Sequence, residues 1–174
     1  MSSGISQRIS LWGFGGLFLL MAIDVGCAGE TQVEGVSVKQ ENKMVEKSEQ
    51  EWRSQLTPEQ FQVLRESGTE RAFTGEYTDT ETLGTYVCAG CDAKLFQSIH
   101  KFHSGCGWPS FYLPFEKGSI TKHSDFELER ERVEIRCATC GGHLGHVFED
   151  GPPPTGLRYC INSVALKLKE SPQD

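Results

Sequence analysis

The sequence lacks an excess of basic residues. Among its 174 residues, 24 Asp and Glu outnumber 17 Lys and Arg, which gives a net charge of −7. Nucleic-acid binding needs a basic face that neutralises phosphates, so this composition argues against a nucleic-acid partner. The hydrophobic fraction is also modest, at 37%. A domain with so lean a core often needs a metal or a covalent cross-link for stability, and seven cysteines are available to supply one.

The chain also lacks an apolar run of the length, about 20 residues, that a transmembrane helix needs. The run at residues 11–23, LWGFGGLFLLMAI, follows Arg8 and precedes three small residues at 26–28. A positive start, a short apolar run and a small-residue exit are typical of secretory signals. We therefore expect a signal peptide or lipoprotein signal at residues 1–28, and an exported protein that is periplasmic or membrane-anchored if its source is a bacterium.

Three alternatives exist for the processing of this segment. Val25-Gly26-Cys27 resembles the lipobox of bacterial lipoproteins, which would place a lipid on Cys27, although Asp24 stands where that box normally has an aliphatic residue. Cleavage after Ala28 fits the pattern equally well. An uncleaved anchor is the third alternative.

Composition divides the rest of the chain into three segments. Residues 29–50 are rich in Glu, Lys, Gln and Ser without periodicity, which predicts a flexible polar linker. A folded domain is expected over residues 51–169, with a short tail at 170–174.

The first element of this domain is predicted to be a helix. Thr57 is a suitable N-cap, Pro58 suits the first turn, and Gln60 completes a capping box. Gly68 is a natural terminator of the same helix.

No alternation of strands and helices follows, so a Rossmann or thioredoxin-like layout is not expected. Instead, Val133 and Ile135 alternate with charged residues, and so do the apolar residues of 164–168 in part. Short alternating runs between Gly-rich turns and the Pro152–Pro154 loop predict antiparallel strands. The fold class is therefore α+β and mostly β.

Two segments of the domain repeat one pattern, Cys-Ala-x-Cys followed by Leu after three residues. The first contains Cys88 and Cys91, and the second contains Cys137 and Cys140. Two such turns supply the four thiolates of a tetrahedral zinc site. We therefore predict a structural Zn²⁺ held by these four cysteines, with no open coordination position and no organic cofactor.

Three other interpretations of these cysteines exist. They could form disulfides, which an exported protein permits, or redox-active Cys-x-x-Cys pairs. Alternatively, zinc could use Cys137, Cys140, His143 and His146 and leave the first pair free. The duplication favours the four-cysteine site, because it explains both pairs together.

Two further cysteines, Cys106 and Cys160, remain in the domain. Cys106 lies in a Gly-flanked loop. In the strand-like run around Cys160, alternate residues share a face, so Arg158, Cys160 and Asn162 are expected on the accessible side. An adjacent guanidinium favours the thiolate, which is the reactive form of cysteine. Cys160 is therefore a candidate nucleophile, although an isolated cysteine is more often a small buried apolar residue.

Four segments of the domain resemble the methionine-R-sulfoxide reductases, the MsrB family, over roughly residues 51–169. These segments are Gly68–Phe73, Ser104–Phe111, Gly141–Phe148 and Arg158–Ser163. The resemblance implies that antiparallel sheets form a small barrel-like domain. It also implies that Cys160 attacks the sulfur of methionine sulfoxide, that methionine leaves, and that Cys106 resolves the resulting sulfenic acid as a disulfide.

The resemblance further implies the partners and the remaining site residues. Oxidised proteins or peptides are the substrates, and thioredoxin or a similar dithiol reduces the disulfide. Trp108 forms the apolar wall for the substrate methyl group, and Phe148 is a second candidate for substrate binding. His143 and His146 bind the sulfoxide oxygen and supply a proton. Arg158 and Asn162 orient the site and favour the thiolate.

Two other functions compete with this one. A zinc-ribbon interaction module would explain the four zinc ligands but not the Arg158-x-Cys160-x-Asn162 pattern or the histidines. An exported thiol-disulfide exchanger would use Cys106 and Cys160. Turnover of methionine sulfoxide separates both from the enzyme.

Overall fold

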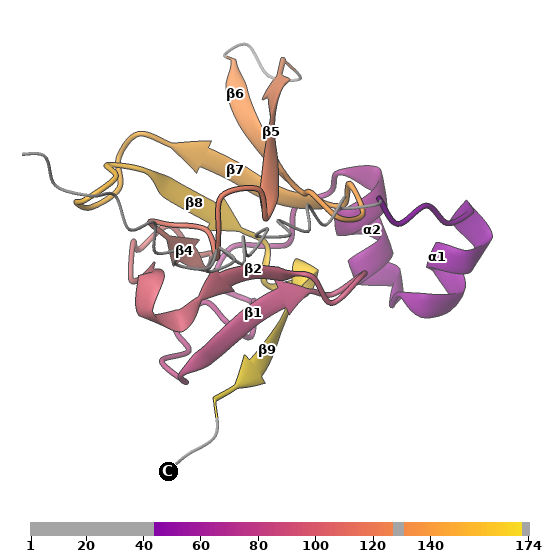
Figure 1. Ribbon diagram of the computed structural model, residues 1–174, viewed down its shortest axis with the longest axis horizontal. Helices are drawn as coiled ribbons and strands as arrows, with labels where there is room; N and C mark the ends of the chain where they lie inside the picture. Colours follow the sequence, from indigo (N-terminus) through magenta and orange to yellow (C-terminus); the bar gives the residue numbers. More distant parts are fainter. Residues whose placement is uncertain (1–43, 127–130, 172–174) are drawn as a thin grey trace, which may run out of the picture. The chain divides into compact units, whose positions relative to one another are not determined.

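The computed structural model of the chain describes residues 44–126 and 131–171 (Figure 1). The predicted signal, Cys27 and most of the predicted linker lie outside the described residues, as does most of the tail. In the described part, no helix combines the length and apolar character needed to cross a bilayer.

Two short helices precede the sheets. Helix α2 (Pro58–Glu66) begins as predicted, because Thr57 is its N-cap and forms the capping box with Gln60. Its end differs from the prediction, since Ser67 adopts the left-handed conformation (φ 56°) that Gly68 was expected to supply. Gly68 follows and donates its N–H to the Gln62 carbonyl at 2.9 Å.

Helix α1 (Glu49–Gln55) was not predicted. Ser48 caps it, and Glu51 completes a second capping box, so regular structure begins inside the segment 29–50 that composition indicates as a linker. Trp52, on α1, is 3% exposed and belongs to the core. Its burial gives this short helix the tertiary contact that an isolated seven-residue helix needs.

Within residues 44–126 and 131–171, the remaining elements are nine strands and two 3₁₀ turns, and every strand pair is antiparallel. One sheet has the strand order β2-β1-β9, and the other has the order β3-β4-β8-β7-β6-β5. The elements are β1 (Gly84–Cys88), β2 (Lys94–Gln97), η1 (Ser98–His100), β3 (Lys101–Phe102), β4 (Ser110–Phe111), β5 (Ile120–Asp125), β6 (Arg132–Cys137), β7 (His143–Phe148), β8 (Arg158–Ile161), η2 (Ser163–Ala165) and β9 (Leu166–Glu170).

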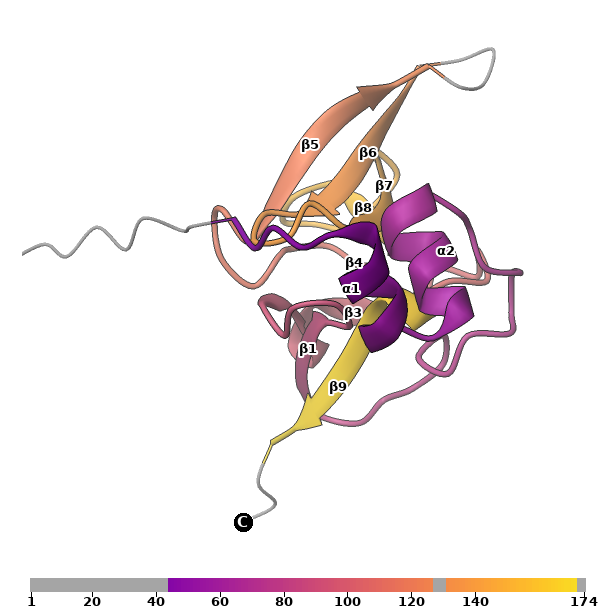
Figure 2. The same ribbon diagram turned by 90° about the vertical axis from the view of Figure 1, so that its right-hand side faces the viewer.

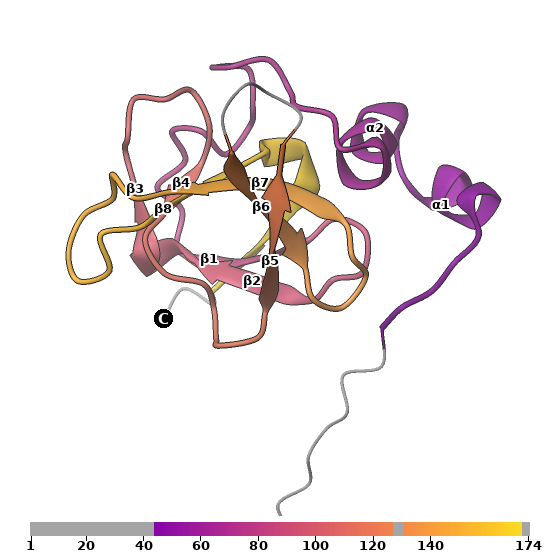
Figure 3. The same cartoon turned by 90° about the horizontal axis from the view of Figure 1, so that it is seen from above.

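The predicted fold class is confirmed. Seen from above, strands of the two sheets surround a common interior (Figure 3), and both helices lie to one side of them (Figure 1), the side that faces the viewer in Figure 2. The interior is filled by side chains such as Phe96 and Phe111, whose rings stack at 4.4 Å, and Tyr86, which meets Phe111 edge-on. Apolar side chains packed in this way are the main source of the domain's stability.

The predicted alternation holds for β8, but only in part for β6 and the last strand. Tyr159 and Ile161 are buried, whereas Arg158 and Cys160 are half-buried. In β6, Ile135 is buried as expected, but Glu134 is buried as well. Val164 lies in η2 rather than in a strand. The reason is that the chain must turn there to leave the larger sheet and enter the smaller one as β9.

Candidate active site

A row of chemically active residues crosses the larger sheet. Residues that face each other on adjacent strands share a side of the sheet. Ser110 on β4 faces Cys160 on β8, Cys160 faces His146 on β7, and His146 faces Glu134 on β6. Strand pairing therefore places a hydroxyl, a thiol, an imidazole and a carboxylate side by side, although they come from four separate segments.

The two non-repeated cysteines meet at this row. The loop between β3 and β4 carries Cys106 to a position where its Sγ atom lies 3.6 Å from the Sγ of Cys160. Both thiols are free and only partly buried. A disulfide needs a sulfur–sulfur distance of about 2.05 Å. The pair can therefore close with a small shift, for which the flanking Gly105 and Gly107, both at positive φ, give the loop freedom.

The ionisation of the pair differs from the expectation. Burial, together with the neighbouring Cys106, raises the pKa of Cys160 to about 12, and Arg158 offsets only part of this effect. Burial also disfavours the Cys106 thiolate, but hydrogen bonds with Ser104, Ser110, the Trp108 backbone and Cys160 together outweigh it and lower the pKa of Cys106 to about 7. Of the two thiols, Cys106 is therefore the more acidic.

Arg158 is partly neutralised, which explains why it does not ionise Cys160. Its Nε and Nη2 donate to the two carboxylate oxygens of Asp150, each at 2.8 Å. Its guanidinium also lies over the ring of Phe148, at 4.5 Å from the centroid. Asp150 thus holds the guanidinium beside the thiols, and the ring of Phe148 packs against its face.

Both predicted histidines are held by carboxylates. His143 Nδ1 donates to Glu134 Oε1 at 2.6 Å, and His146 Nε2 donates to Asp125 Oδ2 at 2.8 Å. Burial lowers the pKa of His143, so its neutral ring presents the lone pair of Nε2, a buried atom without a hydrogen-bond partner. His146 lies next to Cys160 and is the more exposed of the two, with 12% of its side chain accessible.

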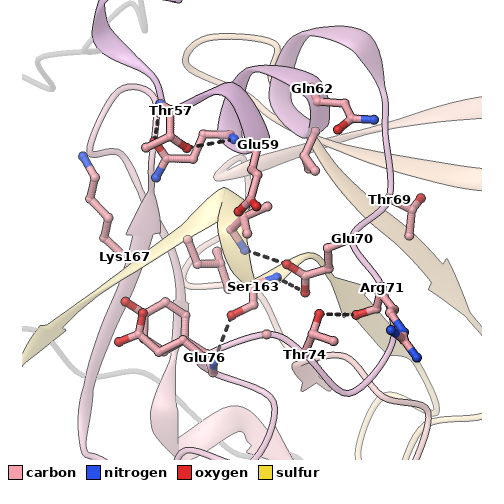
Figure 4. A pocket seen from close by; sticks show the side chains of 16 residues that line it. Thr57, Glu59, Gln62, Thr69, Glu70, Arg71, Thr74, Glu76, Ser163 and Lys167 are labelled. Carbon is pink, nitrogen blue, oxygen red and sulfur yellow. Dashed lines mark hydrogen bonds between the residues drawn. The ribbon is translucent and has the colours of Figure 1, made fainter.

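The two predicted residues Trp108 and Asn162 are joined by one residue that the sequence analysis missed, Glu70. The Glu70 carbonyl accepts the indole N–H of Trp108 at 3.1 Å, and its backbone N–H donates to Asn162 Oδ1 at 3.0 Å. The Glu70 carboxylate accepts the backbone N–H groups of Ser163 at 2.6 Å and Val164 at 2.9 Å (Figure 4). Glu70 therefore fixes the turn that follows Cys160 and the wall beside it.

Asn162 is buried rather than on the accessible face. It follows the last residue of β8, its side chain is 3% exposed, and its Nδ2 donates to the Leu144 carbonyl at 3.0 Å. The strand ends before Asn162, so the alternation that exposes Arg158 and Cys160 does not extend to it. Its contacts fit an orienting role.

Two pockets are lined by residues of this row and by their neighbours. One, of about 540 Å³, is lined by Cys106, Arg158 and Asp150. The other, of about 260 Å³, is lined by both histidines together with Asp125 and Glu134. A third cavity, of about 630 Å³, lies behind Glu70 and contains neither thiol nor histidine (Figure 4). The chemistry belongs to the first two hollows, because the titratable groups gather there.

The two Cys-x-x-Cys turns have the same local structure. In the first, Asp92 N–H donates to the Cys88 carbonyl, and in the second, Gly141 N–H donates to the Cys137 carbonyl, at 2.9 and 2.8 Å. Both donors adopt the left-handed conformation, at φ 58° and 67°. The repeat seen in the sequence is thus a repeat of backbone geometry, which aims both thiols of each turn at one point.

The four sulfurs of these turns fit a tetrahedral metal ion. All four lie within 4.8 Å of one another, with Cys88 and Cys140 at 3.7 Å and Cys91 and Cys137 at 3.6 Å. Zinc–sulfur bonds of 2.3 Å impose a separation of about 3.8 Å between tetrahedral ligands. His143 is bonded to Glu134 instead, so the alternative with two histidine ligands does not fit this geometry.

Comparison with known proteins agrees with these features. The SelR domain family matches residues 56–170. A protein of Agrobacterium fabrum named peptide methionine sulfoxide reductase MsrB is 61% identical over 122 residues, which are 70% of this chain and 90% of that protein. A protein of the same name from Leptospira interrogans is 56% identical over 129 residues, 74% of this chain and 98% of that protein.

The chain belongs to the MsrB family. It is therefore an oxidoreductase, and the family expected from the sequence is confirmed. In this MsrB, the structure brings Cys106, Cys160, Arg158 and His146 to one row and its rim. It places His143, Trp108 and Asn162 around them. The Glu134 carboxylate holds His143, and the Glu70 backbone holds Trp108 and Asn162.

The residues that sequence reasoning missed are mainly those that hold the MsrB site in place. They are Glu70, Ser104, Ser110, Asp125, Glu134 and Asp150. Ser104 and Ser110 lie within the resembling segment around Cys106, so a search for hydrogen-bond donors near each thiol could have found them. The four carboxylates act on residues distant in sequence, and no local pattern indicates their partners.

Glu70 gives a prediction for this MsrB. In the Glu70→Gln variant, one of the two backbone N–H groups would face an amide N–H₂ instead of an oxygen. Leaving one buried donor unsatisfied should lower the free energy of unfolding by about 1–3 kcal/mol, as measured by urea denaturation. The exposed Glu59, which lines the same cavity, provides the control Glu59→Gln. An equal change in both variants would contradict the structural role of Glu70.

Proposed function

We propose that this enzyme reduces the R epimer of methionine sulfoxide in oxidised proteins or peptides, and free methionine sulfoxide in addition, by means of Cys160 and Cys106. The observation that carries the proposal is the contact between these two sulfurs beside His146 on one side of the sheet. Two thiols at this distance, with an acid–base group next to them, form a site for two-electron reduction of a sulfur–oxygen bond.

In the first step, Cys160 attacks the sulfoxide sulfur. The sulfur–oxygen bond of the substrate breaks, its oxygen moves to Cys160 as a sulfenic acid, and methionine leaves. Methionine sulfoxide and a thiol thus become methionine and a sulfenic acid, with no other reductant. Because burial raises the pKa of Cys160 in the free enzyme, its proton must be transferred when the substrate binds.

His146 is the best-placed group to bind the sulfoxide oxygen. It lies opposite Cys160 across the strand pair, and Asp125 fixes its Nε2. Its Nδ1 therefore remains free to take up the Cys160 proton and to deliver it to the substrate oxygen as that oxygen gains negative charge. His143 is buried and neutral, so we assign it the support of this hollow through Glu134.

Trp108 completes the binding site. The half-buried indole of Trp108, fixed through its N–H to Glu70, offers an apolar face to the methyl group of the substrate. A sulfur stereocentre is selected when its methyl group and its oxygen meet different surfaces, and the indole and the His146 side provide them. Phe148 lies under Arg158, so we assign it a supporting role.

In the second step, Cys106 attacks the sulfenic acid of Cys160, and water leaves as the disulfide forms. An external dithiol of the thioredoxin type then reduces the disulfide. The hollow that is lined by Cys106 and Arg158 gives such a protein access to the Cys106 sulfur. The export signal and a lipid on Cys27 remain predictions for residues outside the described part, and they would place this reaction outside the cytoplasm.

The four-cysteine cluster would hold a structural Zn²⁺, which supplies cross-linking of the two repeated turns rather than chemistry at the substrate. Its ligands close the tetrahedron, and the reactive sulfurs belong to a separate pair. Cys88, Cys91, Cys137 and Cys140 thereby join the two sheets, since the first turn follows β1 and the second follows β6.

Turnover of separated epimers tests the proposed function. With dithiothreitol as reductant, the enzyme should convert the R epimer of a methionine sulfoxide peptide to methionine and leave the S epimer unchanged, as measured by chromatography. Turnover of the S epimer alone, or of neither epimer, would contradict the proposal. The second result would favour a zinc-ribbon module or a thiol-disulfide exchanger.

A further inference from the structure

Two serine hydroxyls surround the sulfur of Cys106. Ser104 Oγ donates a hydrogen bond to Cys106 Sγ at 3.0 Å, and Ser110 Oγ lies 3.5 Å from the same sulfur. The two hydroxyls also contact each other, at 2.7 Å. They therefore form a short chain, in which the Ser110 hydroxyl can donate to Ser104 while Ser104 donates to the sulfur.

The position of Ser110 is set by the sheet. It faces Cys160 across the β4–β8 pair and is 1% exposed, so little water competes for its hydroxyl. Ser104 lies two residues before Cys106, and its Oγ also accepts the Cys106 N–H at 3.4 Å. One hydroxyl comes from the sheet and the other from the loop, and both meet at the sulfur that must attack Cys160.

The Trp108 carbonyl is a hydrogen-bond acceptor for both Cys106 and Ser110, and the bonds that it accepts depend on the charge of the Cys106 sulfur. It accepts from Cys106 Sγ at 3.6 Å and from Ser110 Oγ at 3.2 Å. When Cys106 loses its proton, its own bond to this carbonyl is lost. The Ser110 hydroxyl can then turn from the carbonyl toward the negative sulfur, because hydrogen bonds to an ionised acceptor are the stronger ones.

We propose that Ser104 and Ser110 are catalytic residues of the second half of the reaction, in which their linked hydroxyls hold Cys106 as a thiolate directed at the Cys160 sulfur. The inference rests on the proposed function. The Cys106 thiolate attacks the sulfenic sulfur, the sulfur–sulfur bond forms, and the sulfur–oxygen bond breaks. The hydroxide that leaves takes up the proton that Cys106 released, and the net products are the disulfide and water.

The direction of the pKa shift agrees with this geometry. Burial alone would raise the pKa of Cys106, yet hydrogen bonds bring it down to about 7 from an ordinary value of 9.0; those of Ser104 and Ser110 contribute most, followed by the Trp108 backbone and Cys160. The other charged or titratable groups near this sulfur are Cys160 and Arg158 on β8, Asp150 after β7, and His103 in the same loop. All of these stay in place when the serines are changed.

Removing both hydroxyls should change the pH dependence of disulfide formation. A return of the Cys106 pKa from about 7 to its ordinary value of 9.0 would lower the thiolate fraction at pH 7 from about one half to about 1%. A thiolate of higher pKa is also the better nucleophile, by roughly eightfold for two pKa units. The Ser104→Ala/Ser110→Ala variant should thus form the disulfide about sixfold more slowly at pH 7 and several-fold faster at pH 10, with a crossing near pH 8.

The experiment follows the second step directly. The full-length enzyme is mixed with excess R-sulfoxide in the absence of reductant, and samples are quenched with a sulfenic-acid trap and an alkylating agent. Mass spectrometry then gives the rate at which the Cys160 sulfenic acid becomes the Cys106–Cys160 disulfide. The single variant Ser104→Thr, which keeps both hydroxyls, should show most of the wild-type pH profile. Ser54→Ala, in the exposed part of α1, is the matched control and should leave it unchanged.

Each result decides the inference. A crossing of the two pH profiles, with rescue by Ser104→Thr, supports it. Superimposed profiles, or slowing by the same factor at every pH, would overturn it. A purely structural role of the serines would change the rate but not the pKa of the Cys106 thiol, on which the shape of the pH profile depends. If the wild-type enzyme forms no sulfenic acid on Cys160, the proposed function fails, and this inference fails with it.

Discussion

The Cys160→Ser variant should release no methionine, even in a single turnover with stoichiometric enzyme. The sulfur of Cys160 receives the substrate oxygen, and a serine hydroxyl cannot become a sulfenic acid. Loss of the nucleophile should lower the rate by at least about a thousandfold. The measurement is chromatography of methionine after mixing enzyme and R-sulfoxide peptide without reductant.

The matched control is Cys106→Ser, which removes the other member of the pair. This variant should still release about one equivalent of methionine, because Cys106 acts only after methionine has left. It should then stop, since thioredoxin has no disulfide to reduce. Stoichiometric methionine from Cys160→Ser would show that the nucleophile has been wrongly assigned. Sustained thioredoxin-dependent turnover by Cys106→Ser would remove Cys106 from the mechanism.

Replacing Cys88 with serine should have the largest effect on stability. The thiol is fully buried, and its sulfur lies within 4.8 Å of the sulfurs of the other three cysteines. A structural zinc contributes a folding free energy on the order of 10 kcal/mol, as large as the total stability of many domains. The Cys88→Ser protein should therefore contain less than one zinc per chain and melt more than about 15 °C lower, or fail to fold.

Metal analysis and calorimetry provide the measurement, with Cys106→Ser as the cysteine control outside the cluster. If Cys88→Ser does not fold at all, the wild-type protein gives the same test. Removal of its metal with a thiol reagent and a chelator should lower its melting temperature by a similar amount. A zinc content and melting temperature equal to those of the control would contradict the four-cysteine site.

Local patterns predicted the parts of the site that lie within one segment. The alternation around Cys160 correctly placed Tyr159 and Ile161 inside, because a strand on a buried core has a period of two. The duplicated Cys-x-x-Cys turns predicted a cluster that the structure shows as four neighbouring sulfurs. Helix α1 was missed although its capping box, Ser48 to Glu51, is visible in the sequence, because the polar composition around it indicated a linker.

Interactions between distant segments could not be predicted in this way. Glu134 looks like an exposed residue of an alternating strand, yet strand pairing buries it against His143. Asp150 removes much of the influence that Arg158 was expected to have on Cys160. The order of the two thiol pKa values follows from hydrogen bonds of serine hydroxyls to Cys106 and from the burial of Cys160. Both arise only when the strands pair in the folded protein. The sequence therefore indicated the two candidate sulfurs but not which of them is the more acidic.

The central claim is that Cys160 and Cys106 together supply the two electrons that reduce the sulfoxide. Its most direct measurement is the reaction of the wild-type enzyme with excess R-sulfoxide peptide in the absence of any reductant, followed by mass spectrometry under non-reducing conditions. The account predicts one equivalent of methionine and one new disulfide per chain, between residues 106 and 160, with the four-cysteine cluster unchanged. Methionine without that disulfide, or a disulfide within the four-cysteine cluster instead, would contradict it.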